Sequence, residues 1–224
     1  MTDRTSILTG VYTGRAGILK EEGHRSAIVK FLVRSRLRLD ATGLDGDEQA
    51  DPRAHGGTDR ALHYYPPEHY AFWQSEFPRH AEKFALGTFG ENVSASGWTE
   101  DNVQIGDVFR IGSAIVEISV LRKPCWKLNH RFEIPTLAKQ VQDERRSGWF
   151  FRVLEPGDLQ VGDACTRIQS AASSMTLKAL WDVYLAHRPG LDALCAARDL
   201  PALAASWKQA LGCRIDWLAK NANG

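Results

Sequence analysis

The sequence lacks the features that mark several large classes of protein. Lys and Arg total 28 against 27 Asp and Glu, a formal net charge of +1, so no global positive field exists to hold a nucleic-acid backbone or an acidic membrane surface. No run of about 18 apolar residues occurs, and Met1 to Gly10 has no apolar core of a secretory signal. We therefore expect a cytoplasmic protein with neither a nucleic-acid nor a membrane partner.

Motifs of the common enzyme classes are absent as well. The chain contains no P-loop, no G-x-G-x-x-G, no G-x-S-x-G and no H-E-x-x-H, so kinase, dinucleotide-binding, serine-hydrolase and zinc-protease functions lose their usual support. Its cysteines form neither C-x-x-C nor a Cys/His zinc spacing. They are Cys125, Cys165, Cys195 and Cys213. We expect reduced, individually placed thiols, and each is judged alone.

Most of the chain has the pattern of β structure. Ile7 to Tyr12 and Ala27 to Val33 are rich in β-branched and aromatic residues. Two Gly-Asp turns, Gly106-Asp107 and Gly162-Asp163, each precede a predicted strand. One helix is expected from Pro67 to Phe77. The pattern favours a β-rich α+β fold built on a mostly antiparallel β-barrel.

The last part of the chain has helical periodicity. A polar run of small residues, Gln169 to Ser174, precedes apolar stripes at helical spacing in Leu177 to Leu185 and Leu203 to Leu218. We expect a barrel domain over residues 1–169 and a three-helix domain over residues 170–224. The helices contain no residue assigned to chemistry. They are expected to cap the barrel or to dock a partner, and their deletion is expected to leave a site in the barrel largely intact.

Cys125 differs from the other cysteines in its charged neighbours. It lies in Arg122-Lys123-Pro124-Cys125-Trp126-Lys127, directly after a predicted strand over Ala114 to Leu121. Nearby positive charge favours the thiolate, which is the form that acts as a nucleophile or as a soft-metal ligand. From spacing alone, a thiol without a role at the end of a strand is equally consistent.

Two further segments could bind an anion or a heterocycle. Gly56 and Gly57 allow positive φ and close backbone approach, and Arg60 can donate two hydrogen bonds to a phosphate. His55 begins the same segment. The segment Phe89-Gly90-Glu91-Asn92 places an amide beside a carboxylate, which suits the edge of a heterocycle. Ordinary turns would explain both segments equally well.

Taken together, these segments resemble a MOSC domain of the YiiM type. The set is far more specific than any one member, and the segment after Ser170 is similar to the three-helix unit that follows the domain in such proteins. The motifs are Gly43-Leu44-x-Gly46-Asp47, His55-Gly56-Gly57-x-Asp59-Arg60-Ala61, Tyr65-Pro66-x-Glu68-His69-Tyr70, Phe89-Gly90-Glu91-Asn92, Gly106-Asp107 and Arg122-x-Pro124-Cys125.

The resemblance implies a barrel that binds the molybdenum cofactor, a molybdopterin with a terminal phosphate. It also implies that Cys125 is both the catalytic residue and the protein ligand to molybdenum, a role that suits a thiolate. We expect Arg60 and Arg122 to hold the phosphate and the pterin. The further cofactor-binding candidates are His55, Gly56, Gly57, Asn92, Lys123 and Arg152.

Related members reduce N-hydroxylated compounds such as hydroxylaminopurines. The resemblance therefore implies an enzyme, a molybdenum-dependent reductase in which the reduced metal accepts the oxygen of an N-hydroxyl group. The chain has no flavin or iron–sulfur motif of its own. A separate electron-donating reductase, expected to be a flavoprotein, is thus implied as a partner.

Other functions remain open at this point. The same cysteine and phosphate-binding loop could carry or store the cofactor, or hold a persulfide on Cys125, without turning over a substrate. A cofactor-free thiol enzyme would need a base near Cys125, for which His130 is the candidate. Asp45, Asp47 and Glu48 could hold a hard cation, although an acidic turn in solvent explains them too.

Overall fold

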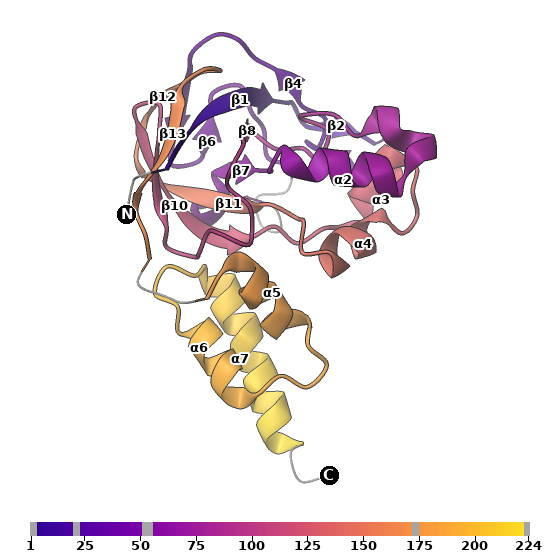
Figure 1. Ribbon diagram of the computed structural model, residues 1–224, viewed down its shortest axis with the longest axis vertical. Coiled ribbons are helices and arrows are strands. Elements are labelled where there is room, and N and C mark those ends of the chain that lie inside the picture. Colours follow the sequence, from indigo (N-terminus) through magenta and orange to yellow (C-terminus); the bar gives the residue numbers. More distant parts are fainter. Residues whose placement is uncertain (1–3, 20–22, 51–55, 172–174, 222–224) are drawn as a thin grey trace.

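The computed structural model describes residues 4–19, 23–50, 56–171 and 175–221. Figure 1 shows a β-barrel with helices α2, α3 and α4 gathered at one side and a separate group of three helices, α5 to α7, beneath it. Within the described part of the chain, no helix is both long and apolar enough to cross a membrane.

Seven strands close into the barrel. β13 pairs with β9 along one edge and with β1 along its other edge, so the sheet closes on itself. In barrel order the strands are β1 (Thr5–Thr13), β8 (Val93–Ala95), β7 (Leu62–Tyr64), β11 (Trp149–Glu155), β10 (Ala114–Leu121), β9 (Val108–Ile111) and β13 (Ala164–Gln169).

The barrel has the expected β-rich α+β class, but it is mixed because one pair of its strands is parallel. β7 and β8 run parallel, whereas the other neighbouring pairs are antiparallel. A parallel pair needs a long crossover rather than a hairpin, and here α2 (Glu68–Glu76) and η2 (Pro78–Lys83) supply it. The sequence therefore predicted α2 correctly but not the strand direction that α2 imposes.

Short strands complete the sheet structure. The expected strand over Ala27 to Val33 is reduced to β4, because much of the segment before it turns towards the cavity described below. The short strands are β2 (Gly17–Ile18), β3 (Arg25–Ser26), β4 (Phe31–Leu32), β5 (Leu37–Asp40), β6 (Gly43–Leu44) and β12 (Gly157–Leu159).

The two Gly-Asp turns open strands as predicted. Gly106 and Gly162 adopt φ values of 90° and 93°, a region that favours glycine. The carboxylates of Asp107 and Asp163 each accept a hydrogen bond of 3.0 Å from the backbone N–H at the start of the turn. β9 and β13 follow directly.

The three-helix unit is packed onto the barrel. It consists of α5 (Leu177–Leu185), α6 (Leu191–Arg198) and α7 (Ala205–Lys220), and its apolar residues belong to the same buried cluster as the barrel interior. Backbone hydrogen bonds join the two parts, including Leu177 N–H to Val103 O and Ala204 N–H to Ser119 O, both at 2.9 Å. The apolar core thus continues across the boundary proposed near residue 170.

A second apolar cluster lies under α2. Its rings include Tyr65, Trp73, Phe89 and Phe132, and it buries one face of two helices that the periodicity did not predict, α3 (Trp126–Phe132) and α4 (Leu137–Asp143). Helices this short are marginal alone and depend on tertiary packing. This packing fixes the chain that follows Cys125.

Candidate functional site

A cavity of about 300 Å³ opens where β10 ends. Its lining comes from within residues 26–30, 47–50, 60–63, 89–92 and 121–127, together with Phe150 of β11. Its size is at the lower end of the range for small-molecule and cofactor sites, roughly 300–1,000 Å³. Four motifs that the sequence analysis selected therefore meet at one cavity, those that contain Asp47, Arg60, Asn92 and Cys125.

Cys125 lies on this cavity as a free, half-buried thiol. It follows β10 and the turn Arg122–Pro124, and it is the N-cap residue of α3, where its carbonyl accepts a 3.0 Å hydrogen bond from Leu128 N–H. Among the lining residues that the structure describes, it is the only thiol.

The other cysteines lie elsewhere. Cys165 is buried in β13, and burial raises the pKa of its thiol to about 12, so it stays protonated. Cys195 and Cys213 lie on α6 and α7. His130, the candidate base of a thiol enzyme, lies on α3 with its ring centroid 6.5 Å from that of Trp126 and is not among the described lining residues.

Arg122 combines burial with an unused donor. The residue is only 8% exposed. Its backbone N–H donates to Gly148 O and its Nη2 donates to Phe89 O, both at 3.2 Å. Its Nη1 is buried without a hydrogen-bond partner among the described residues. Burial lowers the pKa of Arg122, but a guanidinium stays protonated in proteins. A buried donor left unpaired costs about 1–3 kcal/mol, so Arg122 is suited to receive an anion.

Arg60 is a second cation on the cavity. It ends η1 (Thr58–Arg60), is half-buried, and has a pKa lowered by that burial. Gly57, the residue before η1, has φ 91°, and its backbone N–H donates to Gln49 Oε1 at 3.2 Å. Arg60 Nη1 donates to Gly56 O at 3.5 Å. Neither glycine is among the described lining residues. The remaining candidate of this loop, His55, lies outside the described residues.

Asn92 lines the cavity, but its amide is fully engaged. Its Oδ1 accepts from His63 N–H at 3.0 Å, and its Nδ2 donates to Tyr12 O at 3.2 Å and to Asp47 Oδ2 at 2.8 Å. The side chain is buried. Asn92 therefore joins the lining segments to one another rather than offering free donors.

A buried ion pair at the cavity was not predicted. Lys30 Nζ lies 2.5 Å from Asp47 Oδ2, with side chains 7% and 9% exposed, and Asp47 Oδ1 accepts from Gly14 N–H at 2.8 Å. Burial lowers the pKa of Lys30, and Asp47 opposes this shift. One signal was available, because Lys30 is the single cation inside the apolar run Ala27 to Val33.

The Lys30–Asp47 pair also bears on the acidic turn of Asp45, Asp47 and Glu48, which the sequence offered as a possible site for a hard cation. Asp47 takes its charge partner from Lys30, and no group of three or more His, Cys, Asp or Glu suited to a metal ion occurs in the described ranges. His63 is a further lining residue that sequence reasoning missed. Burial and then the charge of Arg122 lower the pKa of His63 well below 6.5, so its ring is neutral at neutral pH.

Two of the expected cofactor-binding cations are directed elsewhere. Lys123 lines the cavity, but its ammonium donates to Tyr184 Oη at 2.8 Å. Arg152, on β11, donates to Asp59 and Glu117 at 2.9 Å each and to a backbone carbonyl at 2.8 Å. Arg152 is not among the described lining residues. The structure brings together Cys125, Arg122, Arg60 and Asn92, and it does not bring Arg152 to them.

Comparison with protein-family models identifies the family. Residues 51–166, more than half of the 224-residue chain, match the model described as "MOSC domain". The chain belongs to the MOSC domain family. The matched range contains η1, the Phe89–Asn92 segment and Cys125, so most of the cavity lies inside the MOSC domain.

Relatives extend the similarity beyond that range. The chain is 45% identical to Protein YiiM of Escherichia coli (strain K12) over 168 residues, which cover 75% of this chain and 74% of that protein. It superposes on a crystal structure of YiiM from Escherichia coli with a TM-score of 0.79 at 32% identity, covering 95% of this chain and 92% of that one. A protein named "Reductase" from Gibberella moniliformis is 34% identical over 203 residues, which cover 89% of this chain but 36% of that protein.

Proposed function

We propose that this chain binds the molybdenum cofactor in the cavity, with Cys125 as the protein ligand to molybdenum, and that it reduces N-hydroxylated compounds. Membership of the MOSC family and a relative named as a reductase support an oxidoreductase. The observation that carries the proposal is one cavity lined by the half-buried Cys125 thiol and by Arg122, whose buried Nη1 has no partner among the residues described.

The residues on the cavity fit this group. Molybdopterin has two chemically different ends, a soft metal centre and a phosphate. A cysteine thiolate is a soft ligand, and guanidinium groups such as those of Arg60 and Arg122 form paired, charge-assisted hydrogen bonds with phosphate. Both requirements are met by side chains on the same cavity.

The proposal gives the main polar residues of the cavity distinct roles. Cys125 would bind the metal, and Arg122 and Arg60 would hold the anionic end. The Lys30–Asp47 pair and Asn92 would keep the lining segments in place, because their hydrogen bonds join segments that are distant in the sequence. When bound, the cofactor supplies a two-electron centre that removes the oxygen of an N-hydroxyl group.

A separate reductase would supply the electrons, and we propose a flavoprotein for this part. The relative from Gibberella moniliformis extends far beyond the matched region, which covers 36% of it. The remaining length of that relative would accommodate further domains, and we propose that a separate protein supplies their electron-donating part for this chain.

The test is made on protein produced in a host that synthesises the cofactor. We expect stoichiometric molybdenum and reduction of a hydroxylaminopurine with a chemical electron source such as reduced viologen. Molybdenum without turnover would indicate a cofactor carrier. Turnover by molybdenum-free protein would contradict the proposal and favour a thiol enzyme.

The matched control uses the other thiols. Cys125→Ser replaces a soft ligand by a poor one at nearly the same volume, so the molybdenum content should fall and turnover should be lost. Cys195→Ser and Cys213→Ser change the same atom on α6 and α7 and should keep both. Full activity of Cys125→Ser would remove Cys125 from the site.

A further inference from the structure

Lys123 connects the Cys125 turn to the three-helix unit. Besides the hydrogen bond to Tyr184 Oη, its Nζ lies 4.5 Å from the ring centroid of Tyr184 and 4.7 Å from that of Trp207. Trp181 completes the set, with ring centroids 5.8 Å from Tyr184 and 5.6 Å from Trp207. We call Trp181, Tyr184 and Trp207 the aromatic box. Lys123 is exposed to solvent, and the quadrupoles of these rings together with the Tyr184 hydroxyl favour one position of its ammonium.

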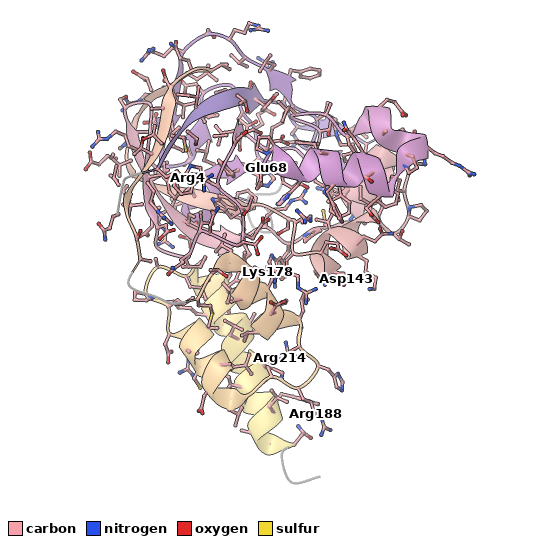
Figure 2. The ribbon with its side chains drawn as sticks, viewed as in Figure 1. Arg4, Glu68, Asp143, Lys178, Arg188 and Arg214 are labelled. Atoms are coloured by element: carbon pink, nitrogen blue, oxygen red, sulfur yellow. The ribbon has the colours of Figure 1, made fainter. Side chains whose placement is uncertain are left out.

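The aromatic box is itself fixed from several sides. Trp181 and Trp207 are buried, and Trp181 Nε1 donates to Ser147 Oγ at 3.1 Å. Arg214 of α7, labelled in Figure 2, donates to the backbone carbonyl of Tyr184 at the end of α5. Tyr184 and Trp207 therefore form a fixed receptor for the ammonium of Lys123, and Trp181 supports both rings.

A second connection reaches the same turn through the barrel. Ser147, the hydrogen-bond partner of Trp181, precedes Gly148, whose carbonyl accepts from Arg122 N–H at 3.2 Å. Cys125 follows Lys123 after a single residue, Pro124, whose ring fixes φ and stiffens the turn. A shift at Lys123 is therefore transmitted to the backbone of Cys125.

We propose that Lys123 is a positioning residue, whose ammonium is held by the aromatic box so that the three-helix unit fixes the Cys125 thiol at the cavity. This inference adds to the proposed function, because it gives residues 175–221 a part in the site. It also replaces the sequence-based expectation that Lys123 binds the cofactor and that the helices serve only as a cap or a docking surface.

The test measures the alkylation of Cys125 by iodoacetamide in the full chain without cofactor. The rate is followed by mass spectrometry over a range of pH up to its plateau, with the exposed Cys213 as an internal reference. The midpoint of the pH profile reports nearby charge, whereas the plateau, where the thiol is fully ionised, reports access and geometry. A role limited to stability would not move the plateau.

Two variants separate charge from position. Tyr184→Phe removes the hydrogen bond but keeps the ring and the charge of Lys123, and Lys123→Met removes the ammonium but keeps an unbranched side chain. Freeing the turn should expose the half-buried thiol, so the plateau rate should rise about fivefold in Lys123→Met and by a smaller factor in Tyr184→Phe. Lys123→Met keeps the aromatic box intact and decides the outcome if Tyr184→Phe fails to fold.

The control is Arg4→Met, which removes a cation 5.5 Å from the centroid of the Trp98 ring. Neither Arg4, labelled in Figure 2, nor Trp98 is among the described cavity-lining residues. Its plateau should match that of the wild type. Wild-type plateaus in both Lys123→Met and Tyr184→Phe, even with a lowered thermal midpoint, would overturn the proposal. The measurement needs neither molybdenum nor turnover, so failure of the proposed function would leave its result unaffected.

Discussion

Replacement of Arg122 by Met should weaken anion binding and leave the stability of the cofactor-free protein nearly unchanged. The guanidinium is buried, its Nη2 donates to Phe89 O, and its Nη1 has no hydrogen-bond partner in the part of the chain that the structure describes. The variant loses one hydrogen bond to a charged group, about 1.5–3 kcal/mol, and it relieves an unsatisfied buried donor, about 1–3 kcal/mol. Because these effects have opposite sign and similar size, the free energy of unfolding should change by less than about 2 kcal/mol.

Urea denaturation of the cofactor-free protein, with and without pyrophosphate, measures both quantities. Pyrophosphate should stabilise the wild type, and Arg122→Met should lose about 1.5–3 kcal/mol of binding free energy, equivalent to tenfold or more in Kd. The control is Arg152→Met, because the guanidinium of Arg152 already has three partners, namely Asp59, Glu117 and the carbonyl of Ala202. It should lose stability and keep the pyrophosphate response. Our interpretation of Arg122 would be refuted by an unchanged pyrophosphate response together with a stability loss above about 3 kcal/mol.

Three further predictions concern pH, the turn behind Arg122, and the helices. Burial raises the pKa of Glu91 above 4.5, so the folded protein retains a proton that the unfolded chain releases, and stability should fall as pH rises from 4.5 through the raised pKa. Glu91→Gln should flatten that fall in the urea midpoint, and an unchanged pH profile would contradict it. Gly148→Ala places a Cβ 2.3 Å from Tyr64 O at φ 72°, so thermal unfolding should show a loss of about 1–3 kcal/mol or more. Gly57→Ala, also at positive φ but with no described atom within 4 Å of the added Cβ, should lose less stability. Deleting residues 171–224 should lower both the thermal midpoint and the molybdenum content, and full molybdenum in the truncated protein would contradict the positioning role of the helices.

The sequence predicted the parts of the fold that depend on local signals. Gly106-Asp107 and Gly162-Asp163 predicted turns before strands, because glycine and a capping carboxylate define that geometry within four residues. The helix α2 and the three C-terminal helices followed from periodicity. The motifs around Arg60, Asn92 and Cys125 identified segments that line one cavity, although their sequence separation concealed the contact.

The features that sequence reasoning missed depend on contacts between distant residues. Lys123 finds its partner Tyr184 sixty-one positions along the chain. Lys30 pairs with Asp47 seventeen positions away, so the isolated cation in the apolar run could be noticed in the sequence but its partner could not. The helix α3 forms because packing of Leu128 and Phe132 supports a short helix that is not stable alone. The parallel β7–β8 pair follows from the topology rather than from either strand.

X-ray absorption at the molybdenum edge tests the central claim most directly, because it counts the sulfur atoms bound to the metal. The measurement compares wild-type protein from a cofactor-producing host with Cys125→Ser and with Cys213→Ser. We predict that the wild type and Cys213→Ser share one more sulfur ligand than Cys125→Ser, whose molybdenum content should also fall. The same number of sulfur ligands in all three proteins, at equal molybdenum content, would contradict the assignment of Cys125 as the ligand.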